Sequence, residues 1–219
     1  MITAHLATIP GREQSLRKTV DSLLPQVDWI YIALNGHTEV PETLKGVERL
    51  TMAFMDNSLG DAAKFSFLDM VDGYVLICDD DLVYPPSFAA IMQDKVVLHG
   101  CPVSFHGKSY AKRPIESFRK DHTSNHRCLC SVVGDHEVDI IGTGTLAFRV
   151  GDIKLSIADF PYPNMADIWF SKLAHEQGIK LIAVEHPRGI LRYIKPETTI
   201  WRNMSDGVKE TEVINTFLK

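Results

Sequence analysis

Three consecutive carboxylates, Asp79, Asp80 and Asp81, are the residues best suited to chemistry. They directly follow residues 74–78, an uninterrupted apolar run typical of a strand buried on both faces. Adjacent carboxylates repel one another unless a cation or hydrogen-bond donors compensate them. Asp79 and Asp81 point the same way in an extended segment, which suits Mg²⁺ or Mn²⁺ with positions left open for phosphate oxygens. The alternative is a solvated acidic turn.

The elements that would position these carboxylates alternate between strand and helix. Strands are expected at residues 2–9, 29–34, 47–54 and 74–78, and helices at 15–27 and 61–71. Such alternation predicts an α/β fold with a mostly parallel, doubly wound central sheet. Ligands of such sheets bind at the carboxyl ends of the strands, where the acidic turn would lie.

The second half of the chain is less regular. Strands are expected at residues 96–105, 128–133, 146–150 and 179–184, and a helix at 165–177. No linker or repeat divides the sequence, so residues 1–195 are expected to form one domain. Residues 196–219 are polar and are expected to form a tail, a candidate mobile flap over the site.

Composition narrows the class of protein. The 219 residues are 45% hydrophobic and 23% charged, which excludes a disordered chain. No apolar run approaches the roughly 20 residues of a membrane-spanning helix, and the first residues do not resemble a signal peptide. Four irregularly spaced cysteines do not form a disulfide framework. We expect a reduced, cytoplasmic protein, with association at a membrane surface left open.

Charge is unevenly distributed along the chain. The net charge is −5, which argues against a protein that coats nucleic acid indiscriminately. Residues 104–130 nevertheless contain six Lys or Arg and only two Asp or Glu. A basic segment on an acidic body indicates either a specific anionic ligand or a solvated loop.

Several motifs occur in a fixed order along the chain. They are Thr8-Ile9-Pro10-Gly11-Arg12, residues 57–65, Asp79-Asp80-Asp81 with Tyr84-Pro85-Pro86, His99-Gly100, residues 142–145 and residues 164–169. Together this series resembles the GT-A fold glycosyltransferases, similar to family 2 enzymes and to bacterial capsule or surface-polysaccharide transferases. The resemblance covers residues 2–195.

The resemblance implies a nucleotide-sugar donor site that depends on Mn²⁺ or Mg²⁺. Asp81 would be the direct metal ligand, Asp79 would lie near the metal or the ribose, and Asp80 would belong to the same donor-binding turn. Lys64 would lie near the donor phosphates. The residues expected around the nucleobase and ribose are Thr8, Pro10, Arg12, Asn35 and Asp56. For Arg12 and Lys64, the alternative is a plain surface cation.

Two further roles follow from the resemblance. Asp167 matches the carboxylate that takes a proton from the acceptor hydroxyl in inverting members, although Ala166 stands where family 2 enzymes often have Glu. The alternative is a helix N-terminal carboxylate that only interacts with the helix dipole. His186 matches the position of a third metal ligand, and the alternative is an ordinary histidine.

Two patterns remain open. His122, His126, Cys128 and Cys130 have ligand types that suit zinc, in a spacing that is not a common zinc motif. Gly142-Thr143-Gly144-Thr145 is either a turn beside the donor sugar or a structural hairpin.

The function expected from these observations is metal-dependent transfer of a sugar, with inversion, from a UDP-sugar to an acceptor hydroxyl. The expected acceptor is a surface glycan or its precursor. Three alternatives stay open: the same chemistry on a polyanionic acceptor such as modified DNA, a sugar-phosphate nucleotidyltransferase, and a non-catalytic module that binds nucleotide-sugars.

Overall fold

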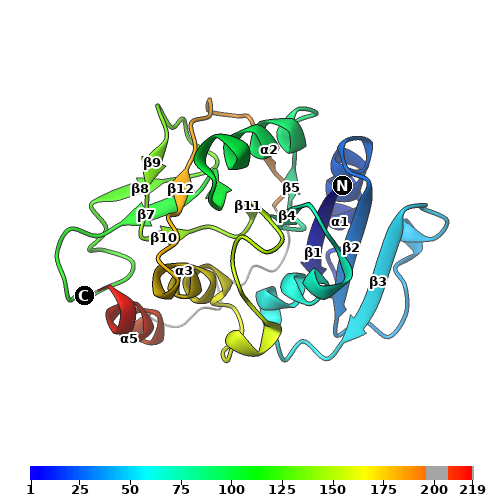
Figure 1. Cartoon of the computed structure of the whole chain (residues 1–219). Helices are drawn as coiled ribbons and strands as arrows, with labels where there is room; N and C mark the ends of the chain where they lie inside the picture. Colours follow the sequence, from blue (N-terminus) through cyan, green and yellow to red (C-terminus); the bar gives the residue numbers. More distant parts are fainter. Residues whose placement is uncertain (196–206, 219) are drawn as a thin grey trace.

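The computed structural model describes residues 1–195 and 207–218. In this part of the chain, one eight-stranded sheet has the order β3-β2-β1-β4-β11-β6-β12-β9 (Figure 1). Its strands are β1 (Ile2–Thr8), β2 (Trp29–Asn35), β3 (Leu50–Met55), β4 (Tyr74–Cys78), β6 (Val103–Ser104), β9 (His136–Glu137), β11 (Thr145–Arg149) and β12 (Ile182–Ala183). Smaller sheets join β10 (Ile140–Ile141), β7 (Gly107–Ser109) and β8 (Ser124–His126), and β13 (Arg192–Tyr193) with β5 (Leu82–Val83).

The first four strands of the large sheet are parallel. β1 pairs with β2 and β4, and β2 pairs with β3, all in parallel register. β11 then runs antiparallel to β4, and β12 is parallel to β6. The predicted α/β fold with a mostly parallel sheet is confirmed, and the strand expected at residues 74–78 is β4 without any change of bounds.

Alternate residues of β4 serve two hydrophobic layers, as the two-residue period of a strand requires. Leu76 packs in a core with residues of α1 (Glu13–Leu23) and α2 (Phe88–His99). Val75 and Ile77 pack on the other face with residues of α3 (Ala166–Glu176) and α5 (Val208–Phe217). The sheet is therefore covered on both faces, with α3 and α5 next to each other (Figure 1).

Two helix predictions in the first half need correction. The helix expected at residues 15–27 is α1 followed by the 3-10 turn η1 (Leu24–Gln26), which includes Pro25. The helix expected at 61–71 is instead two 3-10 segments, η3 (Gly60–Phe65) and η4 (Leu68–Met70). In a 3-10 helix, residues three apart are eclipsed. This geometry places Asp61 and Lys64 on the same side of η3, where both meet charged or polar partners.

Strand predictions in the second half were less accurate. Residues 96–105 were expected to be a strand, but Val96 lies in α2, where it continues the buried face of Phe88 and Met92. Gly100, with φ +64°, ends that helix. Residues 128–133 contain a turn rather than a strand, and β12 is shorter than the strand expected at 179–184. Short 3-10 turns η2 (Glu42–Leu44) and η5 (Ile157–Asp159) complete the elements.

The polar C-terminal segment supplies part of the core. α5 packs on α3, and its Ile214, together with Leu218, is fully buried. The flap predicted for residues 196–219 therefore does not describe α5, and residues 196–206 and 219 lie outside the described part. Within the described residues, no helix has the length and apolar character needed to cross a membrane.

Candidate active site

The turn after β4 gives its three carboxylates different surroundings. Asp80 is buried and accepts hydrogen bonds from Thr8 Oγ1 at 2.6 Å and Arg12 Nη1 at 2.5 Å. Burial raises the pKa of Asp80, while Arg12 and Thr8 oppose that rise. The structure thus brings three predicted residues together, with Asp80 as the group that ties the turn to β1 and to the start of α1.

Asp81 differs from Asp80 because little compensates its charge. Its side chain is only 15% exposed, and its Oδ2 lies 3.8 Å from Arg12 Nη1. Among the described residues, the Asp81 carboxylate accepts no hydrogen bond. Burial, with added repulsion from Asp79 and Asp80, raises the pKa of Asp81 to about 7. A cation bound here would relieve this repulsion.

Asp79 is half exposed and bonded to a buried lysine. Lys64 Nζ donates to Asp79 Oδ1 at 2.9 Å, and the Lys64 side chain is only 3% exposed. Burial lowers the pKa of Lys64, but Asp79, Asp61 and Asp167 raise it by a larger amount. The net shift of the pKa is therefore upward. A Cβ added at Gly144 would fall 2.1 Å from Asp79 Oδ2, so glycine lets this turn approach Asp79.

Asp167 lies in the first turn of α3 and is held through one oxygen. Its Oδ1 accepts hydrogen bonds from the Thr143 backbone N–H at 2.7 Å and the Thr143 hydroxyl at 2.6 Å. The turn at residues 142–145 therefore joins Asp79 to Asp167, since Gly144 touches one and Thr143 binds the other. The second oxygen of Asp167 has no such fixed donor among the described residues.

Sequence reasoning missed Asp61. Its carboxylate oxygens both lie 3.3 Å from the backbone N–H of Ala166, at the start of α3. Burial raises the pKa of Asp61 to about 7, and Asp167 and Asp79 add to the rise while Lys64 opposes it. The signal in the sequence that could have identified Asp61 is its position three residues before Lys64, which places both side chains on the same side of η3. Asp61 fixes the N-terminus of α3, and with it Asp167, relative to η3.

The residues predicted around the nucleobase fall into two groups. Asn35 ends β2 and donates from Nδ2 to the Gly60 carbonyl at 2.8 Å, which ties β2 to η3, and Pro10 lies next to Gly36. Asp56 is exposed and accepts a hydrogen bond from the Ser58 N–H at 2.9 Å. Thr8, Pro10, Arg12 and Asn35 thus lie at one edge of the sheet, while Asp56 caps its own turn after β3.

The metal role expected for His186 stays a prediction, and the structure shows what its ring contacts. Its ring packs 4.5 Å from Phe105, and its nitrogens face the carbonyls of Val184 at 2.8 Å and Arg127 at 3.4 Å. No three His, Cys, Asp or Glu side chains in residues 1–195 and 207–218 are grouped to hold a metal ion. In the described residues both ring nitrogens of His186 therefore face backbone carbonyls and not Asp79 or Asp81. The cluster His122, His126, Cys128 and Cys130 is likewise not assembled as a zinc site.

Asp79 and Asp81 still fit a hard divalent cation. They supply carboxylate oxygens, the ligands that Mg²⁺ and Mn²⁺ prefer, and Mg²⁺ sites commonly take the remaining ligands from water and phosphate. The uncompensated charge of Asp81 favours such an ion. Asp79 and Asp81 would supply two ligands to the ion, and the oxygens of a diphosphate would supply others.

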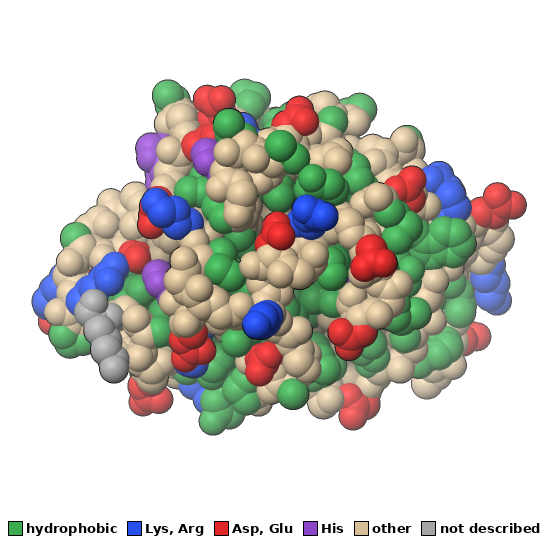
Figure 2. Space-filling view, in the orientation of Figure 1, with side chains coloured by type: hydrophobic (Ala, Val, Ile, Leu, Met, Phe, Trp, Pro, Cys, Tyr) green, Lys and Arg blue, Asp and Glu red, His purple; other side chains and the backbone are tan. Residues whose placement is uncertain are grey.

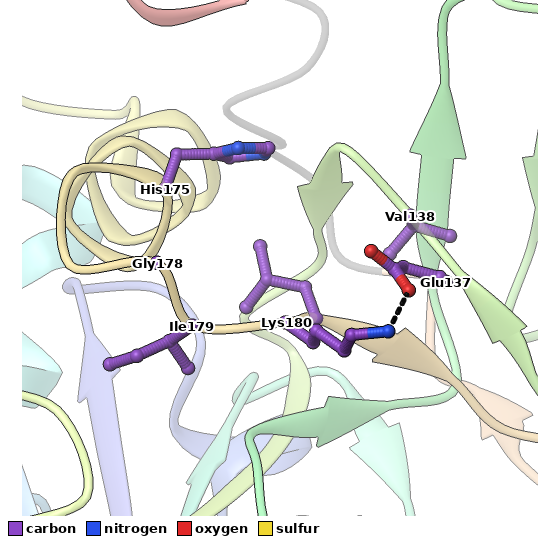
Figure 3. Close-up of a pocket in the computed structure, with 7 residues that line it drawn as sticks. Glu137, Val138, His175, Gly178, Ile179 and Lys180 are labelled. Atoms are coloured by element: carbon purple, nitrogen blue, oxygen red, sulfur yellow. Dashed lines mark hydrogen bonds and ion pairs between the residues drawn. The ribbon is translucent and has the colours of Figure 1, made fainter.

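A separate hollow of about 250 Å³ lies where α3 ends against β9 (Figure 3). It is lined by Glu137, Val138, His175, Gly178, Ile179, Lys180 and Leu181. Glu137 and Lys180 pair across it at 2.8 Å. It includes none of the carboxylates after β4, and it lies about 15 Å along the α3 axis from Asp167. The carboxylates after β4, and not this hollow, therefore form the candidate site.

Comparisons with known proteins show the fold. No protein-family model matches the sequence, and no curated protein matches it. A nucleotidyl transferase from Methanothermobacter aligns with a TM-score of 0.50 and 17% identity over 86% of this chain and 88% of its own. A 4-diphosphocytidyl-2C-methyl-D-erythritol synthase from Anaerococcus prevotii aligns with a TM-score of 0.51 and 14% identity over 100% of this chain and 98% of its own. The chain therefore shares with these two proteins an α/β fold built on a mostly parallel central sheet.

Proposed function

We propose that the protein is a metal-dependent glycosyltransferase that uses a nucleotide-sugar, with UDP as the expected nucleotide. One observation carries the proposal: the turn of residues 142–145 holds Asp167 beside the Asp79–Asp81 turn, with Lys64 between them. The carboxylates that would bind the sugar donor through a metal ion, and the carboxylate that would accept a proton, are then neighbours at the carboxyl end of β4. Sheets of this kind bind ligands at that edge.

On the donor side, Asp79 and Asp81 would hold Mg²⁺ or Mn²⁺. When bound, the ion neutralises the charge of the departing diphosphate. Lys64 orients Asp79 through the 2.9 Å hydrogen bond, and Asp80 fixes the turn to Arg12 and Thr8. The side chains at the ends of β1 and β2 would surround the base and ribose.

On the acceptor side, Asp167 takes the proton. Thr143 holds Oδ1, which leaves Oδ2 to accept the proton of an acceptor hydroxyl. The oxygen of that hydroxyl attacks the anomeric carbon while the bond from that carbon to the diphosphate oxygen breaks on the opposite face. The products are an inverted glycoside, a nucleoside diphosphate and one proton on Asp167.

The acceptor proposed is a hydroxyl of a glycan or its precursor. On the face drawn in Figure 2, acidic and basic side chains alternate without a broad basic area. That face does not suit indiscriminate binding of nucleic acid. A polyanionic acceptor such as modified DNA would have to be recognised locally, and steep loss of activity with added salt would indicate it.

Nucleotidyl transfer is the second candidate. Of the two structures compared above, one is named a nucleotidyl transferase and the other a 4-diphosphocytidyl-2C-methyl-D-erythritol synthase. The turn between β1 and α1 argues against nucleotidyl transfer in this chain. It spans only residues 9–12, and Arg12 is bound to Asp80. The products separate the two candidates: glycosyl transfer releases a nucleoside diphosphate, whereas nucleotidyl transfer from a nucleoside triphosphate releases pyrophosphate.

The test is thermal stability against a panel of nucleotides, each with and without Mn²⁺. A ligand that binds the folded state stabilises it by about 2.7 kcal/mol at a hundred times its Kd. We expect stabilisation by UDP with Mn²⁺, abolished in Asp81→Asn and retained in Asp72→Asn, a control that changes an exposed carboxylate before β4. Equal stabilisation of Asp81→Asn and the native chain would remove Asp81 from the site.

A further inference from the structure

Lys108 is a buried cation that the proposed reaction does not use. It lies on β7, and only 9% of the residue is exposed. Among the described residues its ammonium has no ion pair within 4.0 Å and no hydrogen bond, and its Nζ lies 4.0 Å from the centre of the Phe118 ring. A lysine side chain buried to this extent, with no anion beside its ammonium, is costly, so its retention calls for an explanation.

The sheet places Lys108 on the same face as other basic groups. His106 is two residues earlier and so points to the same side, and a Cβ added at Gly142 would lie 2.6 Å from His106 Cβ. β7 lies between β10 and β8 (Figure 1). Lys108 pairs with Ile140 of β10 on one side and with Asn125 of β8 on the other. Arg127 follows β8 directly and lies close enough to lower the pKa of His106, which burial lowers most.

This basic face adjoins the proposed base. The Gly142 N–H donates to the His106 carbonyl at 2.8 Å, and the next residue, Thr143, binds Asp167. Burial lowers the pKa of Lys108, while Asp167 raises it and Arg119 lowers it. Asp167 is therefore near enough to act on Lys108 through space but does not pair with it.

We propose that Lys108, with His106 and Arg127 beside it, binds a phosphate group on the substrate whose hydroxyl faces Asp167. The claim that this phosphate belongs to the acceptor substrate rests on the proposed function. The claim that Lys108 binds a phosphate is independent of it. The donor diphosphate is a poorer occupant, because Asp167 is the carboxylate that acts on the charge of Lys108, whereas Asp79 is paired with Lys64 at 2.9 Å. An ammonium and a guanidinium are the groups that bind phosphate oxygens most strongly in proteins.

The experiment measures phosphate binding directly, by calorimetry at low salt with EDTA present, so that metal-free Asp79 and Asp81 repel the anion. The probes are glycerol 3-phosphate, neutral glycerol and the diester dimethyl phosphate. The variants are Lys108→Met, which keeps the apolar stem, Lys108→Arg, which keeps the charge, and Lys112→Met. Lys112 is a matched control because it is exposed in the same basic segment and pairs with Glu116.

We expect glycerol 3-phosphate to bind, glycerol not to bind, and Lys108→Met to weaken binding about tenfold or more. Lys108→Arg and Lys112→Met should bind as the native chain does. Binding of glycerol 3-phosphate alone identifies a phosphate monoester on the substrate, and equal binding of dimethyl phosphate identifies a phosphodiester. Absence of binding by both phosphates, or equal binding by Lys108→Met, would overturn the proposal.

Nucleotide stabilisation with Mn²⁺, measured on the same variants, separates this proposal from the proposed function. Lys108→Met should keep the stabilisation by UDP and Mn²⁺. If no nucleotide stabilises any variant while phosphate still binds through Lys108, the donor assignment fails and the phosphate site stands. If UDP with Mn²⁺ stabilises every variant and phosphate does not bind, the donor assignment stands and the phosphate site at Lys108 fails.

Discussion

Two buried lysines, in two regions of the molecule, have opposite electrostatic surroundings. Lys64 lies under the β4 turn, 2.9 Å from Asp79 and within the influence of Asp61 and Asp167, so its charge is compensated. Lys108, on the small sheet of β10, β7 and β8, faces the ring of Phe118, and within residues 1–195 and 207–218 no carboxylate pairs with it. Removing one partner of a buried ion pair destabilises the fold, whereas an unpaired buried charge is itself a cost that its removal relieves. The comparison therefore separates groups that organise the site from groups that meet a ligand.

Asp167 stands between the two regions, and its removal should have the largest effect. Asp167→Asn keeps an oxygen for the Thr143 hydrogen bonds but cannot take the acceptor proton. We expect turnover to fall by about 10² to 10⁴-fold, with nucleotide and Mn²⁺ affinity within about twofold of native. Release of UDP from the UDP-sugar that stabilises the protein most would measure turnover. An unchanged rate would place the base elsewhere.

Asp80 tests the compensated region. Asp80→Ala leaves Arg12, whose side chain is 9% exposed, without its closest carboxylate. We expect the free energy of unfolding to fall by about 3–5 kcal/mol, as for other broken buried ion pairs. Urea unfolding would measure it, with Asp72→Ala as the exposed control, expected within about 0.5 kcal/mol of native. A loss no larger than the control's would mean that Asp80 does not secure the turn.

The β4 turn is also the part of the site that sequence predicts best. An apolar run followed by acidic residues indicates a buried strand and a polar edge, and β4 and its carboxylates lie there. The contacts around those carboxylates are harder to predict, because residues such as Asp61 and Ala166 meet although they are 105 positions apart in the sequence. Lys108 was read as part of a solvated or ligand-binding basic segment, since its burial depends on pairing with Ile140, which no local pattern reveals.

Asp135 extends the comparison to a compensated group outside the site. Burial raises its pKa, but hydrogen bonds from Lys95, the Glu185 N–H and His99 together lower the pKa to about 2. A lowered carboxyl pKa stabilises the fold above the unfolded value, near pH 4, and that contribution is lost as the pH falls toward about 2. Asp135→Asn should cost about 1–2 kcal/mol at pH 7, discounted for partial exposure. Urea unfolding from pH 7 to 2 should show the difference from native shrinking; a constant difference would contradict it.

The smallest expected effect is the change in the free energy of unfolding caused by Lys108→Met, and the sign of that change is informative. Lys108→Met removes a charge that has no anionic partner among the described residues and keeps a stem of similar length against Phe118, so we expect the free energy of unfolding to rise by about 1 kcal/mol. Lys64→Met removes an equally buried charge but leaves Asp79 and Asp61 uncompensated, and should lower the same quantity by about 3 kcal/mol. Urea unfolding of both variants without ligand measures the pair. Opposite signs mean that Lys108 is kept for a ligand rather than for the fold, and a similar loss in both would show that Lys108 has a structural partner of its own.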